Sequence, residues 1–371
     1  MNILGQMTIS MILVAFLAGT ASAAGRFRDY CEVHEKGEPK LCSYEPTTVG
    51  LTNDSDDSGF MDFKVSVRYQ LFPDWWTRVQ NWVPRAVSWF PSGVGDDSAL
   101  YFAFTGRFGQ YIGTRDSSPV VEKLFNPKLF YRYWIDKEHE DHLDIAFAHQ
   151  SNGQSIDSPE EYQAALATSR DEHAVKDQLS RGWDYWEISL KQTLYERKKP
   201  AKETPVPKEP CAEDDETCKR AVKAAACKQA CRDCDACQDI ERRELRKTSI
   251  DAYLGRKHFL RHGPLQGRQE NYSEWENDPE GRRLDRVSGF SAMIKWTERG
   301  DRKCFGDLKV AVRYETGIRE ILHYDTVRVE VGTKIIQLPV SVWRQSGYNS
   351  DLAQYFKRVR SYGMQVDIGS F

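Results

Sequence analysis

The sequence predicts an all-β protein, a twelve-stranded antiparallel transmembrane β-barrel, with a small Cys-rich helical insertion on the periplasmic side. Three observations predict this fold. Apolar and polar residues alternate over long stretches, the N-terminus carries an export signal, and the last amphipathic stretch ends in Phe371. A final strand that ends in phenylalanine is typical of bacterial outer-membrane barrels.

The alternation is clearest in FMDFKVSVRYQLF, residues 60–72, where Met61 and Phe63 alternate with Asp62 and Lys64. A period of two places apolar side chains on one strand face and charged ones on the other. A soluble, exported β-sandwich hydrolase has the same period and is one alternative. The long strands, the charged polar face and the aromatic content of 12% favour a barrel with lipid outside.

Twelve strands are expected, and an even number leaves both chain ends in the periplasm. Counting back from the C-terminus places loops 113–124, 152–181 and 262–286 outside the cell. The long segments 73–97 and 196–247 then lie in the periplasm. The expected strands are 44–53, 61–72, 98–112, 125–135, 142–151, 182–195, 248–261, 287–298, 306–315, 320–331, 333–344 and 358–371.

Length, charge and the N-terminus narrow the class of protein. The 371 residues carry a formal net charge of −3, which does not indicate nucleic-acid binding. The mean hydropathy of −0.64 is too polar for a helical membrane protein. A short apolar core before a small-residue cleavage site predicts a signal peptide over residues 1–23. The other expected divisions are an N-terminal periplasmic segment, 24–43, and the barrel, 44–371.

Cysteines mark an insertion within the barrel domain, residues 198–247. Nine cysteines in an exported chain indicate an oxidising compartment, and Cys31 and Cys42 are candidates for one pair. An even cluster of six without interleaved histidine predicts disulfides rather than a metal site, so the insertion is expected to be a stapled helical module with an unknown partner. Its cysteines are Cys211, Cys218, Cys227, Cys231, Cys234 and Cys237.

Polar residues interrupt the apolar face of one predicted strand. In LDIAFAHQSNGQS, residues 143–155, His149 and Ser151 share the parity of the apolar side chains. In the following strand, Asp184 also has the apolar parity. Strands joined by one loop are hairpin neighbours, so the three side chains are expected to meet on the outer wall near the outer leaflet. A serine, a histidine and an acid together suit nucleophilic catalysis.

The stretches HQSNGQS, 149–155, and SRGWD, 180–184, resemble the active-site signature of the bacterial outer membrane phospholipase A family. YEPTTVGL, DFKVSVRYQLF, RDSSPVVEKLFNPKLF and YGMQVDIGSF fall in the family's order, so the resemblance spans about residues 44–371 apart from the two periplasmic segments. It implies a calcium-dependent enzyme that hydrolyses acyl ester bonds of membrane phospholipids as a homodimer. It also implies the outer membrane of a Gram-negative bacterium.

By position in these motifs, Ser151 resembles the nucleophile, His149 the general base, and the amide of Gly153 an oxyanion donor. Asp184 stands where the family has an asparagine. This departure is chemically mild, because aspartate holds the orienting position in the commoner triads.

The resemblance also implies ligands for Ca²⁺. These are the backbone carbonyl of Gln154, the hydroxyl of Ser180, and Ser117 given by the partner subunit. Gln154 replaces an arginine of the family, which a backbone ligand tolerates. Few protein oxygens suit a calcium site that keeps water ligands.

Two alternatives remain open. The barrel suits a non-catalytic porin or scaffold, in which the segment 198–247 would be an interaction module. In addition, DKEHEDH, residues 136–142, offers metal-ligand types at a position where a solvated periplasmic turn is expected.

Overall fold

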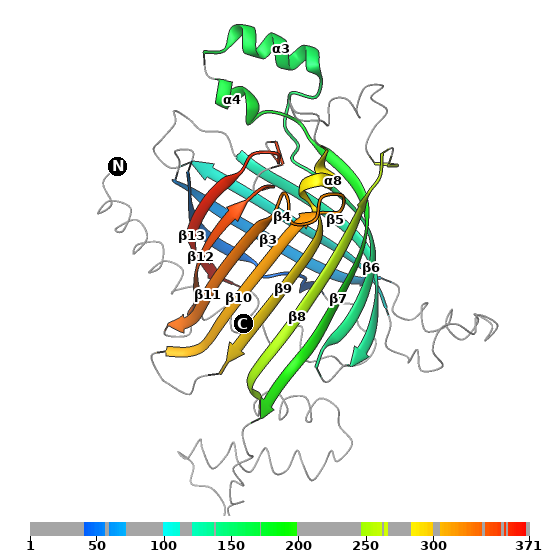
Figure 1. The fold of residues 1–371 in the computed structure, drawn as a ribbon, viewed down its shortest axis with the longest axis vertical. Coiled ribbons are helices and arrows are strands. Elements are labelled where there is room, and N and C mark those ends of the chain that lie inside the picture. Colours follow the sequence, from blue (N-terminus) through cyan, green and yellow to red (C-terminus); the bar gives the residue numbers. More distant parts are fainter. Residues whose placement is uncertain are drawn as a thin grey trace, which may run out of the picture.

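The computed structural model describes most of a closed antiparallel barrel (Figure 1). The described residues are 41–55, 59–71, 99–111, 121–136, 139–170, 172–198, 246–261, 263–265, 283–299, 305–335, 338–349, 352–353 and 355–368. The last strand pairs with the first strand of the ring, so the ring has no free edge. The ring consists of β2 (Thr48–Asp54), β3 (Gly59–Leu71), β4 (Ala99–Tyr111), β5 (Val121–Asp136), β6 (Asp141–Ser151), β7 (Gly182–Lys198), β8 (Arg246–Phe259), β9 (Gly289–Glu298), β10 (Phe305–Gly317), β11 (Thr326–Ile335), β12 (Leu338–Gly347) and β13 (Val359–Asp367).

All twelve predicted strands are present, and the closed ring rules out the sandwich alternative. The largest boundary error concerns β11, which was expected at 320–331. Leu322 has a φ of 71°, a left-handed conformation that a strand does not contain, so residues 318–325 form a loop. The alternation that starts at Val327 continues to Ile335, which moves the connection to β12 from 332 to 336–337.

The short strand β1 (Leu41–Ser43) continues the line of β2, because both pair with β3 at successive positions. Between them Tyr44 and Glu45 leave the wall, and Glu45 lines the lumen. The expected strand 44–53 is therefore interrupted at its start. Cys42 is disulfide-bonded. Its candidate partner Cys31, the predicted signal peptide and the six cysteines of the predicted insertion lie outside the described residues, as does the segment 73–97.

The two faces of the wall differ as the alternation predicts. Outward side chains are apolar and exposed, such as Ile145 at 46%, Ile188 at 54% and Val312 at 43%. Inward side chains are charged and line a lumenal cavity of about 810 Å³. Lipid contacts the first set and water the second, as in other membrane barrels.

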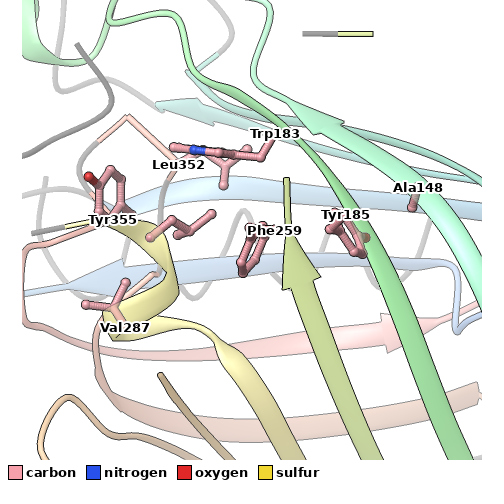
Figure 2. Packing of buried hydrophobic residues seen from close by; sticks show 8 residues of the cluster. Ala148, Trp183, Tyr185, Phe259, Val287, Leu352 and Tyr355 are labelled. Atoms are coloured by element: carbon pink, nitrogen blue, oxygen red, sulfur yellow. The ribbon is translucent and has the colours of Figure 1, made fainter. Parts of the chain in front are cut away.

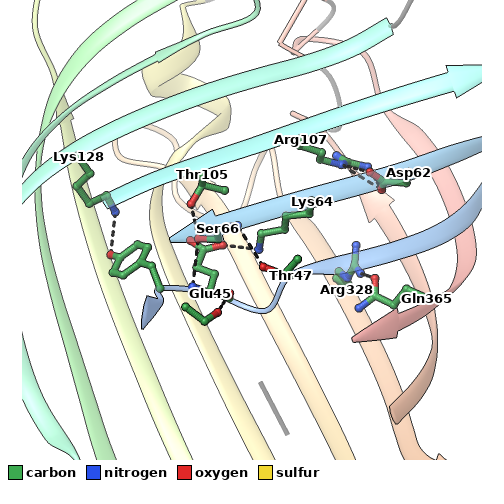
Figure 3. A network of polar contacts seen from close by, with 12 residues as sticks. Glu45, Thr47, Asp62, Lys64, Ser66, Thr105, Arg107, Lys128, Arg328 and Gln365 are labelled. Carbon is green, nitrogen blue, oxygen red and sulfur yellow. Dashed lines mark hydrogen bonds and ion pairs between the residues drawn. The ribbon is translucent and has the colours of Figure 1, made fainter. Parts of the chain in front are cut away.

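Ion pairs join side chains on the lumenal face of the wall, and Figure 3 shows the pair of Arg107 with Asp62. Arg107 and Asp62 lie 2.8 Å apart, and Lys128 and Glu187 lie 2.7 Å apart. Hydroxyls extend the network, since Ser66 and Thr105 share a 2.8 Å hydrogen bond. Arg107 on β4 thus meets its counter-charge on the neighbouring strand β3, and Lys128 on β5 meets Glu187 on β7, with β6 between them. These pairs offset the cost of enclosing the charges.

One end of the lumen holds an apolar cluster, visible in Figure 2. Trp183 and Tyr185 enter it from β7, and Phe259 enters it from β8. Tyr355, in the connection between β12 and β13, meets Trp183 edge-on with ring centroids 5.5 Å apart. The short helix α8 (Leu284–Val287) adds Leu284 and Val287, and Ala148 and Leu352 complete the cluster.

The same end of the barrel carries the helices of the 152–181 connection (Figure 1). They are α3 (Pro159–Thr168), which begins after the capping residue Ser158, and α4 (Glu172–Lys176). Ile156, Val175 and Leu179 form a second buried cluster under α3. This packing holds the connection against the rim. Among the described residues, no helix is long and apolar enough to cross a membrane.

The deepest ion pair yields a first prediction. Arg132 donates two hydrogen bonds to Asp144, of 2.8 and 2.7 Å, and the two side chains are 6% and 4% exposed. Arg132→Met is expected to destabilise the barrel by about 3–5 kcal/mol, because it leaves a buried carboxylate without its counter-charge. Urea unfolding in neutral detergent, followed by tryptophan fluorescence, measures the change.

The matched control is Lys334→Met, which breaks the more exposed pair with Asp307. It is expected to cost about 1 kcal/mol or less. Arg132→Met combined with Asp144→Leu is expected to recover most of the lost stability, since no buried charge remains. Equal costs for the two single variants would contradict this explanation.

Candidate functional site

Strands β6 and β7 bring the predicted residues together on the outer wall. Opposite residues pair in register, and the outward rungs are Leu143 with Leu190, Ile145 with Ile188, Phe147 with Trp186, His149 with Asp184, and Ser151 with Gly182. The first three rungs are apolar, and Phe147 and Trp186 are in ring contact at 5.3 Å. The polar side chains occupy the last two rungs, where β6 ends and β7 begins.

Alternation decides the side on which Asp184 lies. Its neighbours Trp183 and Tyr185 both point into the apolar cluster of the lumen (Figure 2). Successive side chains of a strand point to opposite faces, so Asp184 projects from the outer face. His149 follows the same parity as the exposed Ile145.

The histidine and the acid are in direct contact. His149 Nδ1 lies 2.7 Å from Asp184 Oδ1. If Nδ1 carries the proton that this carboxylate accepts, Nε2 keeps a lone pair. That is the tautomer in which an imidazole accepts a proton from a serine hydroxyl.

Asp184 is 0% exposed, although it lies on the outer wall, because the chain after β8 covers it. The Leu265 amide donates a 2.7 Å hydrogen bond to Asp184 Oδ2, and the Leu260 amide donates a 2.8 Å bond to the Asp184 carbonyl oxygen. A Cβ on Gly263 would lie only 2.1 Å from Oδ2, so glycine allows this close cover. Asp184 thus avoids the cost of a carboxylate that faces lipid.

Ser151 ends β6, paired with Gly182 on one side and with Phe125 of β5 on the other. Its hydroxyl makes no hydrogen bond within the described part of the chain. Such contacts are often long before a substrate is bound.

Asn152 holds the backbone that follows Ser151. It is 1% exposed, its Nδ2 donates to the Leu179 carbonyl at 2.7 Å, and its Oδ1 accepts from the Arg181 amide at 2.8 Å. Gly153 then adopts a φ of 56°, a left-handed conformation that suits glycine. These hydrogen bonds of Asn152 therefore hold the backbone that carries the Gly153 amide.

Two of the three expected calcium ligands lie in adjacent segments. The segments that contain Gln154 and Ser180 are joined by two hydrogen bonds. The Ile156 amide donates to the Gln178 carbonyl oxygen at 3.0 Å, and the Ser180 amide donates to the Ile156 carbonyl oxygen at 2.7 Å. Within the described ranges, neither the Ser180 hydroxyl nor the Gln154 carbonyl makes a hydrogen bond. Both are hard oxygen donors, which fit calcium with water as the remaining ligands. Ser117 lies outside the described residues.

The described chain contains no group of three or more His, Cys, Asp or Glu side chains arranged to hold a metal. In the 136–142 stretch, His139 Nδ1 lies 2.7 Å from Asp136, and Nε2 lies 2.8 Å from Glu196. Its ring is thus held between two carboxylates.

Sequence reasoning missed Asn152 and the cover formed by residues 263–265. Asn152 lies within the motif HQSNGQS, and a polar side chain next to a predicted nucleophile could have indicated a role in the site. No local signal marked Gly263, because its proximity to Asp184 depends on how β8 ends beside β7.

No protein-family model and no curated protein sequence matches the chain. Among solved structures, an active-site mutant of outer membrane phospholipase A from Escherichia coli matches 94% of this chain and 98% of its own, with 12% identity and a TM-score of 0.50. The chain has the fold of outer membrane phospholipase A. A further Escherichia coli structure of that protein covers 90% of this chain and 100% of its own, at 12% identity and a TM-score of 0.48. A calcium-bound outer membrane phospholipase dimer from Salmonella typhi covers 89% and 93%, at 13% identity and a TM-score of 0.47.

The outer membrane phospholipase A fold confirms the predicted architecture and, at the level of the fold, the resemblance drawn from the motifs. It is the fold of a Gram-negative outer-membrane barrel, so the predicted location is also confirmed. At 12% identity the match concerns the fold. The roles of individual residues rest on the geometry of the site.

Proposed function

We propose that the protein is a calcium-dependent phospholipase that hydrolyses acyl ester bonds of the phospholipids around it. The observation that carries this proposal is the 2.7 Å hydrogen bond between His149 and Asp184 on the outer wall, one rung below Ser151. A nucleophile on that wall meets lipid esters directly. The same chemistry covers phospholipase A1, phospholipase A2 and lysophospholipase activities.

Three side chains would perform the two half-reactions. His149 Nε2 removes the Ser151 proton while Ser151 Oγ attacks the ester carbonyl carbon, and Asp184 stabilises the imidazolium that forms. His149 then protonates the leaving alcohol oxygen as the carbon–oxygen bond breaks, leaving an acyl group on Ser151. Water, deprotonated by His149, releases the fatty acid and restores the serine.

The negative charge that develops on the carbonyl oxygen needs a donor. The Gly153 amide is proposed for this role, with its position held by Asn152. Calcium, when bound by the Gln154 carbonyl, the Ser180 hydroxyl and Ser117 of the partner subunit, would add positive charge beside that oxygen. Because Ser117 would come from a second copy, the active form is proposed to be a homodimer.

A non-catalytic porin is the competing function. An apolar cluster fills one end of the lumen of this chain, which does not suit an open aqueous pore. A scaffold remains compatible with the barrel, and the assay below separates it from an enzyme.

Fatty-acid release from phospholipid by the purified full chain tests the proposal. Release is expected in calcium and is expected to fall to background in a chelator. Covalent cross-linking of the same samples shows whether dimers are present. Background release in both conditions, from samples in which dimers are present, would reject the enzyme.

Ser180→Ala is expected to raise the calcium concentration for half-maximal release by about tenfold or more, since even the loss of outer-shell partners weakens metal binding 10- to 100-fold. Saturating calcium should restore most of the rate, because the serine nucleophile is intact. Ser346→Ala, on the outer wall of β12, is the matched control and should leave the calcium curve unchanged. A lower maximal rate at an unchanged calcium requirement would argue against Ser180 as a ligand.

A further inference from the structure

A second cavity, of about 390 Å³, lies at the same end of the barrel as the candidate active site. The end of β8 and the residues after it supply His258, Leu260 and Arg261. The start of α8 supplies Arg283 and Asp285. Arg319, in the loop after β10, also lines it, as do Phe259 and Ile318.

The charges of this cavity are unbalanced. Three arginines face one aspartate. Asp285 pairs with Arg319 at 3.3 Å, which leaves Arg261 and Arg283 without an ion pair to any residue that the structure describes. Two buried atoms of these lining residues have no hydrogen-bond partner there, the Arg283 Nε donor and the Asp285 Oδ1 acceptor, and the arginines outnumber the aspartate. A buried guanidinium donor without a partner is costly, and an anion in the cavity would satisfy it.

The cavity reaches the lipid-facing wall through His258. This residue pairs with Trp186, which is 51% exposed on the outer face. Below it, Ile188 pairs with the exposed Arg256, and Leu254 follows on the same face; Ile188 and Leu254 are exposed at 54% and 47%. Acyl chains that lie along these side chains would end at the level of the arginines.

We infer that this cavity binds the phosphate group of an anionic membrane phospholipid. The guanidinium groups match a phosphate in charge and donor geometry. The exposed Ile188 and Leu254 beneath them match the acyl chains, which a free phosphate would not use. Leu260 links the cavity to the candidate active site, since its amide donates to the Asp184 carbonyl oxygen.

This lipid binding does not depend on hydrolysis, so it is tested with Ser151→Ala protein in which turnover cannot consume the probe. The full chain is held in a neutral maltoside detergent, free of phosphate and with calcium chelated. Dihexanoyl phosphatidylglycerol is titrated by isothermal titration calorimetry. The comparison probes are dihexanoyl glycerol, which lacks the phosphate, and inorganic phosphate.

Phosphatidylglycerol is expected to bind at least about tenfold more tightly than either comparison probe, because only it offers both charge and chains. Arg283→Gln is expected to weaken its binding by about tenfold or more. The matched control is Arg344→Gln, an exposed arginine on β12 that does not line the cavity, and it should bind as the parent does. Arg261→Gln repeats the test at an exposed position if Arg283→Gln does not fold, as judged by far-ultraviolet circular dichroism.

Three outcomes would overturn the inference. Unchanged binding in both Arg283→Gln and Arg261→Gln would exclude the cavity. Equal losses in Arg283→Gln and Arg344→Gln would indicate general surface charge. Inorganic phosphate binding as tightly as the lipid would indicate a site for the free anion. Background fatty-acid release by the parent protein together with intact phosphatidylglycerol binding would contradict the proposed enzyme activity and support the lipid site.

Discussion

Ser151→Ala is expected to lower calcium-dependent fatty-acid release by about 10³-fold or more, as the loss of a nucleophile does in other hydrolases. The substitution removes the hydroxyl that would form the acyl-enzyme. It leaves the backbone pairing of β6 with β5 and β7 in place, because those contacts are made by main-chain atoms. Release of fatty acid from phospholipid in calcium measures the effect.

Ser189→Ala is the matched control for the nucleophile. Ser189 lies on β7 and lines the lumen, so it differs from Ser151 in the face it occupies. Its substitution should leave the rate unchanged. A serine-reactive phosphonate should label the parent protein and Ser189→Ala, but not Ser151→Ala. Retained activity in Ser151→Ala would mean that another residue is the nucleophile.

Asp184→Asn is expected to lower the rate by about 10²-fold or more, by the tautomer effect known for buried triad acids. The two carboxylate oxygens of Asp184 serve two donors, His149 Nδ1 and the Leu265 amide. An asparagine offers one acceptor and one donor. If its oxygen meets the Leu265 amide, its NH₂ group faces His149 and favours the tautomer protonated on Nε2, which cannot act as the base.

This prediction differs from what the resemblance alone implies, since the family has asparagine at this position. The Leu265 amide is the reason, because it demands an acceptor on the side away from His149. The kcat for fatty-acid release, measured against pH, reports the change. Asp157→Asn, an exposed aspartate in the loop after β6, is the matched control and should behave as the parent. Near-parental activity of Asp184→Asn would contradict the two-donor argument.

The sequence alone predicted the barrel because a strand's period is two. The parity of Val65 and of Ile145 specified an outer face, and both are exposed on the outer wall. The same parity put His149, Ser151 and Asp184 on one face of two hairpin neighbours, which the register of β6 and β7 reproduces. These results needed only local alternation and the order of strands along the chain.

Local alternation also misplaced some features. The predicted strand 320–331 included Leu322, whose left-handed φ ends any strand there. The first predicted strand is broken at Tyr44 and Glu45, because Lys128 donates a hydrogen bond to Tyr44 and Lys64 pairs with Glu45 inside the lumen. The second error concerns contacts between residues that are distant in sequence.

The sequence by itself determined the fold class, the faces of the strands and the three residues that share the last outward rungs. Only the tertiary structure decided how Asp184 is covered, what orients Asn152, and that the Arg283 Nε atom is buried beside a cavity that Arg261 also lines. The reason is physical. The face to which each side chain of a strand points follows from the backbone geometry of that strand. The burial of Asp184 and the charge of the second cavity depend instead on which loops come together when the barrel closes.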